Sequence, residues 1–278
     1  SATGTLRTGQ SAYYRVEVPA GETFLVSFDS ASATASNELY ASYDRVPTRS
    51  IFDAASGNNF AANQEILIRE TKGGSYYVFA YGDRASVATD FTLSASLADF
   101  SIREVTPDRG SNRGQVTLSL DGVDFAPNDI VRIVASDGTE RAATQVRYVD
   151  SGELWATFDL QGLTTGVYDV HVGGTGRSAL ADDAFTVTDG QPGRLQYSLS
   201  VPAAVRPGTT TTGTITYTNV GETDVAAPLV FLHGQGATYQ IPGIAEERGS
   251  TVAYIGGGPG APAGILPAGG TMRLPFNF

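Results

Sequence analysis

Cysteine is absent from this chain of 278 residues. Disulfide frameworks, thiol catalysis and thiolate metal sites are therefore excluded. Lysine occurs once, as Lys72, against seventeen arginines, and we interpret this imbalance as genome composition. Histidine occurs only as His171 and His233. These two would have to meet across modules to share a metal ion, so a histidine metal site is not expected.

Long apolar runs are also missing. No stretch of 18 apolar residues exists, so we expect no membrane insertion. No run of 12 or more residues has a convincing helical period in its apolar positions. No signal peptide begins at Ser1, and an exported protein would then have lost its signal or carry it on a longer precursor.

Basic residues are too few for a nucleic-acid partner. The net charge is −11 and the pI is about 4.6, whereas phosphate neutralisation requires clustered Lys and Arg. The acidity is concentrated in residues 98–190, which hold fifteen acidic and seven basic side chains. Residues 191–278 hold four of each.

The sequence is instead rich in glycine, with 33 residues, and in short segments of alternating apolar and polar residues. Residues 24–28 (F-L-V-S-F) and 116–120 (V-T-L-S-L) show this period of two. Such segments, bounded by Gly, Pro, Asn and Asp, predict an all-β fold. The length exceeds that of one typical domain, and we predict three tandem β-sandwich modules over residues 1–97, 98–190 and 191–278.

The first module carries an ordered set of short motifs. They are G-Q at 9–10, Y-Y at 13–14, V-P-A-G at 18–21, N-E-L-Y at 37–40, P-T at 47–48, F-D at 52–53, G-S-Y-Y at 74–77 and F-T-L at 91–93. The set resembles the bacterial pre-peptidase C-terminal domain. This resemblance implies a small jelly-roll-like sandwich appended to secreted proteases and other exported proteins, some of which bind calcium or matrix polymers. Glu38 stands where many members have an acidic residue, but the dense Asp/Asn cluster of a calcium site is absent.

The second module begins with T-P-D-R-G at 106–110 and continues with L-D-G-V-D-F at 120–125, G-V-Y-D-V at 166–170 and A-F-T-V at 184–187. This pattern resembles the IPT/TIG immunoglobulin-like domain across the whole module. The resemblance implies a spacer, interaction or nucleic-acid-binding module, and the acidic charge argues against the last. Trp155, the single tryptophan, is expected in the core of this domain.

The third module combines T-Y-T-N-V-G at 216–221 with L-P-A-G at 266–269. These strings resemble bacterial immunoglobulin-like adhesion repeats, which implies a second immunoglobulin-like sandwich. Residues 234–265 contain many glycines and prolines with little alternation, so we expect an extended loop there.

No catalytic constellation can be assembled from these residues. The string H-G-Q-G at 233–236 is similar to the oxyanion motif of lipases, but the Gly-x-Ser-x-Gly elbow is missing. The string G-G-T-G at 173–176 lacks the Lys-Ser/Thr ending of a phosphate-binding loop. We therefore predict that the chain is not an enzyme and has no cofactor, calcium excepted.

Two sets of residues are candidate binding sites. Asp121, Asp124 and Asp129 lie close in sequence and supply oxygen ligands of the kind calcium prefers, although their spacing does not match an EF-hand and the alternative is a solvated acidic face. Seven of the thirteen tyrosines lie in the first module, and an exposed tyrosine row could stack on sugar rings. The candidate ligand-binding tyrosines are Tyr40, Tyr43, Tyr77 and Tyr81. The alternative is ordinary sheet packing.

The functional expectation is a non-catalytic spacer and adhesion segment of a large secreted or cell-surface bacterial protein. Its expected partners are polysaccharide or an extracellular matrix or cell-surface protein, together with the remainder of a longer parent chain. The alternative is a polysaccharide- or matrix-binding accessory region of a secreted hydrolase. Fold resemblance contributes much to this ranking, and a fold does not by itself define a function.

Overall fold

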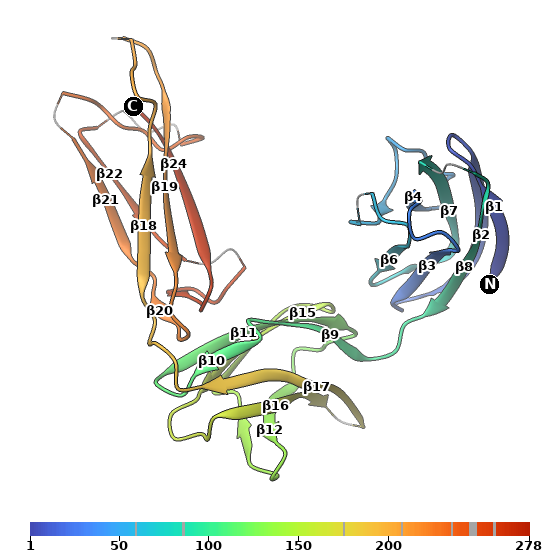
Figure 1. The fold of residues 1–278 in the computed structure, drawn as a ribbon, viewed down its shortest axis with the longest axis horizontal. Coiled ribbons are helices and arrows are strands. Elements are labelled where there is room, and N and C mark those ends of the chain that lie inside the picture. Colours follow the sequence, from blue (N-terminus) through green and yellow to red (C-terminus); the bar gives the residue numbers. More distant parts are fainter. Residues whose placement is uncertain are drawn as a thin grey trace. The chain divides into compact units, whose positions relative to one another are not determined.

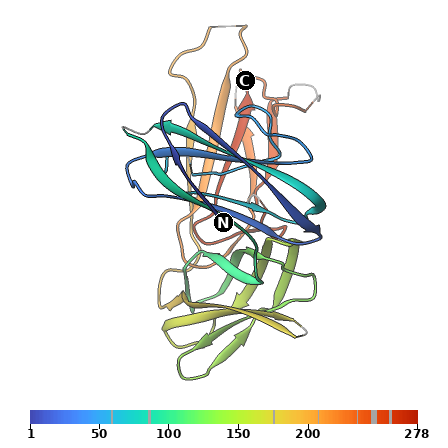
Figure 2. The same cartoon turned by 90° about the vertical axis from the view of Figure 1, so that its right-hand side faces the viewer.

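The segments of alternating residues form strands throughout the molecule (Figures 1 and 2). The computed structural model describes residues 1–58, 60–84, 87–174, 176–206, 208–234, 236–244, 249–257 and 260–278. Within these ranges there is no helix, and the predicted all-β class is confirmed. The described residues therefore include no helix long and apolar enough to cross a membrane.

Contacts divide the chain into two units, residues 1–100 and 101–278. The predicted division into three modules stays a prediction, because the contacts separate only the first unit from the rest. Within the second unit, however, no pairing among the described strands joins those of residues 101–188 to those of residues 195–277. We call these two groups the second and the third sandwich.

The first unit packs two four-stranded sheets, ordered β1-β8-β3-β6 and β2-β7-β4-β5, against each other. The strands are β1 (Ala2–Leu6), β2 (Ser11–Ala20), β3 (Phe24–Ser30), β4 (Ser36–Tyr43), β5 (Ala54–Ala55), β6 (Gln64–Ile68), β7 (Lys72–Arg84) and β8 (Thr89–Leu97). Alternate residues of each strand point inward, and Phe24, Val26 and Phe28 of β3 meet Tyr76 and Val78 of β7 in the core.

The second sandwich packs a five-stranded sheet, β10-β17-β16-β12-β13, on a four-stranded sheet, β14-β15-β11-β9. The strands are β9 (Ser101–Thr106), β10 (Arg109–Ser111), β11 (Gln115–Val123), β12 (Ile130–Ala135), β13 (Glu140–Ala142), β14 (Gln145–Asp150), β15 (Glu153–Asp159), β16 (Gly166–Gly174) and β17 (Arg177–Thr188). Leu118, Leu154, Phe158, Val170 and Phe185 are fully buried.

The third sandwich contains a three-stranded sheet, β18-β19-β24, and two strand pairs, β20-β23 and β21-β22. The strands are β18 (Leu195–Ser200), β19 (Thr212–Asn219), β20 (Val225–Ala226), β21 (Leu229–His233), β22 (Thr251–Ile255), β23 (Ile265–Leu266) and β24 (Thr271–Asn277). Its core is smaller and centres on Ile215, Tyr217, Leu266, Leu274 and Phe276.

The loop expected over residues 234–265 is only partly a loop among the residues described there, and residues 235, 245–248, 258 and 259 lie outside the described residues. Residues 251–255 (T-V-A-Y-I) form β22 and pair antiparallel with β21. Five residues of alternation were too few to stand out among the neighbouring glycines and prolines, and the pairing partner lies eighteen residues away at His233↔Thr251.

Candidate binding face and polar junction

A row of aromatic rings crosses the outer face of the sheet β2-β7-β4-β5 in the first unit. Tyr13, Phe79 and Tyr40 are directly paired on neighbouring strands, so their side chains lie on one face. The ring centroids of Tyr13 and Phe79 are 4.8 Å apart, and those of Phe79 and Tyr40 are 5.6 Å apart, with both pairs stacked. Phe52 extends the row, with its centroid 4.9 Å from that of Tyr40.

The ring at the centre of the row is buried, whereas the rings at its two ends are exposed to solvent. Phe79 is 4% exposed although it lies outside the sandwich core, because its neighbours in the row enclose it. Tyr13 is 54% exposed and Phe52 is 39% exposed. Flat rings open to solvent are the feature that would stack against the apolar face of a sugar ring. We call Tyr13, Tyr40, Phe52, Phe79 and Tyr81 the aromatic face.

A charged pair forms the polar rim of the aromatic face. The Arg49 guanidinium carbon lies 4.3 Å from the centroid of the Tyr81 ring, a cation–π geometry. Arg49 donates from Nε to Oε2 of Glu38 at 2.7 Å and from Nη2 to Oε1 at 2.5 Å. The Tyr40 hydroxyl donates to Oε2 of the same carboxylate at 2.9 Å. This pairing holds the guanidinium over the ring.

The titration of this rim follows from the same contacts. Burial acts to raise the pKa of Glu38, but the hydrogen bonds from Arg49 and Tyr40 outweigh it, so the pKa lies below its usual value. The Arg49 pKa is raised chiefly by its hydrogen bond to Glu38. Burial and the Glu38 hydrogen bond raise the pKa of Tyr40. The rim is therefore a charged pair near neutral pH.

A polar groove of about 320 Å³ adjoins the rim. Its lining includes Asn37, Glu38, Arg49, Asn58, Gln64 and Asp83. Asp83 also lies 3.6 Å from Nη2 of Arg49. The aromatic face and the groove together offer apolar planes beside amide and charged groups, which is the mixture that a sugar polymer would require.

The structure distributes the four predicted tyrosines over two faces. Tyr40 and Tyr81 belong to the aromatic face, and Tyr77 lies on the same side one row further along β7. Tyr43 does not join them. Its ring packs on Tyr76 with centroids 5.3 Å apart, beside the core, and its hydroxyl donates to the Gly73 carbonyl at 3.1 Å. Residues three apart in a strand point to opposite faces, which separates Tyr43 from Tyr40.

Sequence reasoning missed Phe79, Phe52 and Arg49 as members or neighbours of this face, and it counted Tyr13 in the tyrosine cluster without choosing it as a ligand-binding residue. Phe79 could have been found, because it lies between Tyr77 and Tyr81 at the same period of two. Phe52 and Arg49 lie outside any strand, and no local pattern places them over the sheet.

The three predicted calcium ligands are not brought together. No group of three or more His, Asp or Glu side chains suitable for a metal ion occurs among the described residues. Asp129 is 5% exposed, and Nη2 of Arg177 donates to both of its carboxylate oxygens at 2.9 and 2.8 Å. The carboxylate also accepts the Ala126 N–H at 2.8 Å. Asp124 has a positive φ of 57° in the turn after β11, and Asp121 is exposed on β11.

A second candidate site is the junction between the second and third sandwiches. Asp224 of the third sandwich reaches the outer face of β11, where the Thr117 N–H donates to its Oδ1 at 3.0 Å. The Thr117 hydroxyl donates to Oδ2 at 2.6 Å. That hydroxyl lies 2.8 Å from the Thr157 hydroxyl, and since its own proton is used, Thr157 is the donor. The result is a chain of hydrogen bonds from β15 through β11 to Asp224.

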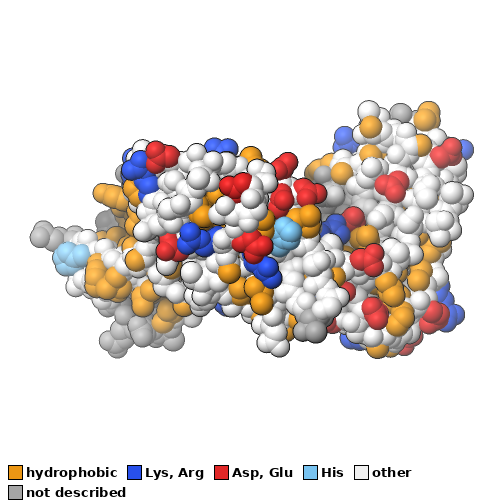
Figure 3. Space-filling view, turned by 90° about the horizontal axis from the view of Figure 1, so that it is seen from below, with side chains coloured by type: hydrophobic (Ala, Val, Ile, Leu, Met, Phe, Trp, Pro, Cys, Tyr) orange, Lys and Arg blue, Asp and Glu red, His pale blue; other side chains and the backbone are white. Residues whose placement is uncertain are grey.

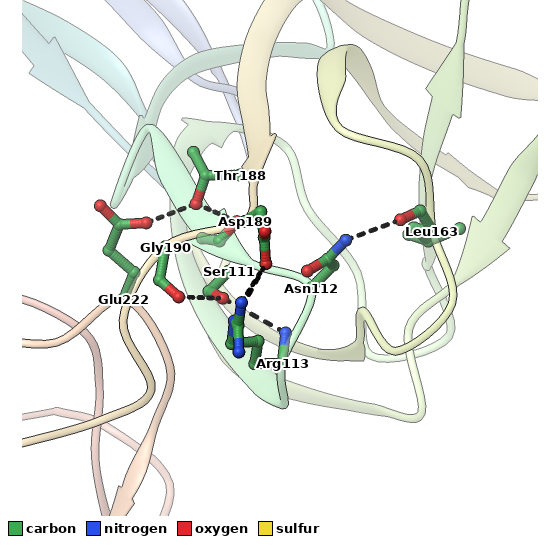
Figure 4. A network of polar contacts seen from close by, with 9 residues as sticks. Ser111, Asn112, Arg113, Leu163, Thr188, Asp189, Gly190 and Glu222 are labelled. Carbon is green, nitrogen blue, oxygen red and sulfur yellow. Dashed lines mark hydrogen bonds and ion pairs between the residues drawn. The ribbon is translucent and has the colours of Figure 1, made fainter.

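The segment that joins the two sandwiches is fixed by further hydrogen bonds (Figure 4). The Ser111 N–H donates to the Glu222 carbonyl at 2.8 Å, and the Ser111 hydroxyl donates to the Gly190 carbonyl at 3.2 Å. The Thr188 hydroxyl donates to the Glu222 carboxylate. Arg113 and Asp189 form an ion pair at 2.7 Å, but both side chains are more than half exposed, so this pair contributes little.

Trp155 lies at this junction and not in the core. It alternates with the buried Leu154 and Ala156, so it points out of the sandwich, and its indole N–H donates to Glu153 at 2.7 Å. Its ring faces Gly260 of the third sandwich. Beside it, Nη1 of Arg147 donates to the carbonyls of Gly260 and Ala261 at 2.9 and 2.8 Å. The expectation of a core tryptophan fails because the third sandwich covers this outer face.

No family model and no curated protein matches the sequence. Among solved structures, a protein of unknown function from Porphyromonas gingivalis W83 aligns at 13% identity over 64% of this chain and 79% of its own, with a TM-score of 0.20. The N-terminal four Ig domains of Dscam1 isoform 8.4 align at 14% identity over 92% of this chain and 66% of their own, with a TM-score of 0.22. At these scores the likenesses carry no argument about function.

Proposed function

We propose that this chain is a non-catalytic spacer and adhesion segment of a larger secreted or cell-surface bacterial protein. The observation that carries the proposal is the polar junction. Asp224, Glu222 and Arg147 tie the third sandwich to the outer face of the second through hydrogen bonds, and we expect these bonds to make the two sandwiches move as one element. A rigid series of sandwiches is what holds a distal domain away from a surface, and the sequence offers no nucleophile–base set for catalysis.

Distance measurements between spin labels test the rigidity. The chain has no cysteine, so Asp137→Cys and Gln196→Cys place one label on each sandwich without removing any native thiol. Both positions are exposed. We expect a single narrow distance distribution, and we expect Asp224→Ala to broaden it. Asp108→Ala, which removes a 79% exposed carboxylate from the second sandwich, is the control. A broad distribution in the otherwise unchanged chain would refute the spacer proposal.

A second candidate function is polysaccharide binding by the aromatic face. The exposed rings of Tyr13 and Phe52, flanked by the Arg49–Glu38 pair, favour it. The experiment is binding of the purified chain to a panel of polysaccharides and matrix proteins, in calcium and in EDTA. We expect saturable binding to one polysaccharide class that Tyr13→Ala and Phe52→Ala each weaken. Tyr197→Ala, which removes an 81% exposed tyrosine from the third sandwich, should leave binding unchanged.

The two candidate functions are compatible, and the panel separates them. Loss of binding in EDTA would assign calcium a part in adhesion. Binding that Tyr197→Ala weakens as much as Tyr13→Ala would remove the aromatic face as its site. Absence of binding in both buffers would leave the spacer role alone.

A further inference from the structure

The inner face of β18 in the third sandwich is uncovered. Tyr197 and Leu199 pair directly with Tyr217 and Ile215 of β19, so all four side chains point toward the same side of the sheet. Tyr217 and Ile215 are core residues, 3% and 9% exposed. Tyr197 is nevertheless 81% exposed and Leu199 is 55% exposed. The core therefore lacks its opposite layer at this edge.

An apolar groove of about 360 Å³ lies between β18 and β21. It is lined by the inner side chains of β18 and β19 and by Pro228 and Leu229–Leu232. The Tyr217 hydroxyl is buried and has no hydrogen-bond partner among the described residues. Figure 3 shows hydrophobic side chains gathered over the third sandwich, at the left of that view. A contiguous group of exposed apolar side chains beside a core is typical of a surface that contacts another segment, protein or ligand.

The two strands bordering the groove have open edges, as far as the described residues extend. β18 pairs with β19 alone, and β21 pairs with β22 alone. The opposite edge of the same sheet, β24, carries Arg273 and Pro275, which discourage the addition of a strand. β18 reads L-Q-Y-S-L-S, without charge or proline, so it has no such protection.

The topology indicates which segment is missing. In a seven-stranded immunoglobulin-type sandwich, strands A, B and E share one sheet, and strands C, F and G form the other. The order β18-β19-β24, with β21 opposite, corresponds to A, B, E and C. Strands F and G follow E along the chain and add to the free edge of C. In that place they would cover the inner face of β18.

We propose that this groove is filled by a β-hairpin from the polypeptide that follows Phe278 in the parent protein. Its first strand pairs with the open edge of β21, and its second strand lays alternate apolar side chains on Tyr197 and Leu199. This inference rests on the proposed function in one respect, because it requires the parent chain to be longer.

The experiment compares this chain with the parent protein extended through its next two predicted strands. Leu199→Cys introduces the sole thiol, and its rate of modification by a maleimide is measured in both proteins. We expect the rate to fall by about tenfold or more in the extended protein, because labelling then requires local opening. Gln196→Cys on the other face of β18 is the matched control and should label equally in both. Hydrogen exchange of β21 in the unsubstituted proteins provides a second measurement that needs no cysteine, and we expect its amides to gain protection.

Each other outcome overturns the inference. Equal labelling of Leu199→Cys in both proteins would show that the hairpin does not enter the groove, while leaving the spacer proposal intact. Protection of this chain that appears only at high concentration, together with a dimer by light scattering, would assign the groove to a second copy. A reading frame that ends at Phe278 would refute the inference, while a parent chain that is longer at its N-terminus would leave the spacer proposal intact.

Discussion

Gly221 is surrounded by backbone atoms at the start of the junction. A Cβ added there would lie 2.2 Å from the Pro192 carbonyl oxygen, 2.6 Å from the Gly193 Cα and 2.8 Å from the Arg194 nitrogen. Backbone cannot move aside as a side-chain end can, so Gly221→Ala should lower the free energy of unfolding of the second unit by about 1–3 kcal/mol. Urea unfolding followed by Trp155 fluorescence measures it. Gly257→Ala, whose nearest neighbour would be 3.7 Å away, should unfold as the unsubstituted chain does, and equal effects would contradict the packing argument.

The buried carboxyl of Asp224 should make the stability of the second unit depend on pH. Burial raises its pKa above the usual value, although hydrogen bonds from Thr117 and Ala268 oppose the shift. A carboxyl whose pKa is raised on folding contributes stability that is complete below its unfolded pKa, about 3.9, and is lost as the pH rises through the folded pKa. The stability of the unsubstituted chain relative to Asp224→Asn should therefore fall across that window and then stay level. Urea unfolding of both proteins from pH 4 to pH 7 would reveal it, and a relative stability that increases with pH would refute it.

The strand β7 illustrates how far period-two alternation predicts this structure. Its residues Tyr76 and Val78 lie in the core and Tyr77 lies outside, as alternation requires. Alternation cannot say what covers an outer face. Trp155 and Thr157 point out of the second sandwich. Their surface becomes a junction because the third sandwich covers it. Arg49 and Phe52 reach the aromatic face from a loop whose course depends on tertiary contacts, so the sequence predicts the strands but not that part of the candidate site.

The pairing of β2 with β7 depends in part on the ring of Tyr13. Because that ring stacks on Phe79 and helps to bury it, Tyr13→Ala should lower the stability of the first unit by about 1–2 kcal/mol. Tyr13→Phe keeps the stack and should cost less than about 0.5 kcal/mol. Hydrogen-exchange mass spectrometry of β7 across a urea series measures both. If the alanine and phenylalanine variants exchange alike, the ring is not a packing element.

At the scale of the whole molecule, the second unit contains two sandwiches with separate cores but a shared junction. Unfolding of the third sandwich would break the hydrogen bond from Thr117 to Asp224 and the hydrogen bond from Arg147 to the Gly260 carbonyl. It would also expose the Trp155 ring. The two sandwiches should therefore unfold together, although no strand pairing connects them within the described part of the chain. The proposed rigid spacer would require such coupled unfolding.

Phe276→Ala tests this coupling. Phe276 is 2% exposed in the core of the third sandwich, and truncation there should cost about 3–5 kcal/mol. We expect hydrogen exchange to accelerate in β19 and β24 and also in β11 and β15, with a red shift of Trp155 emission in the same transition. Adding Asp224→Ala should confine the acceleration to β19 and β24, whereas adding the control Asp108→Ala should not. If Phe276→Ala by itself leaves β11 and β15 protected as before, the junction is only a contact, and the sandwiches are independent domains joined by a linker.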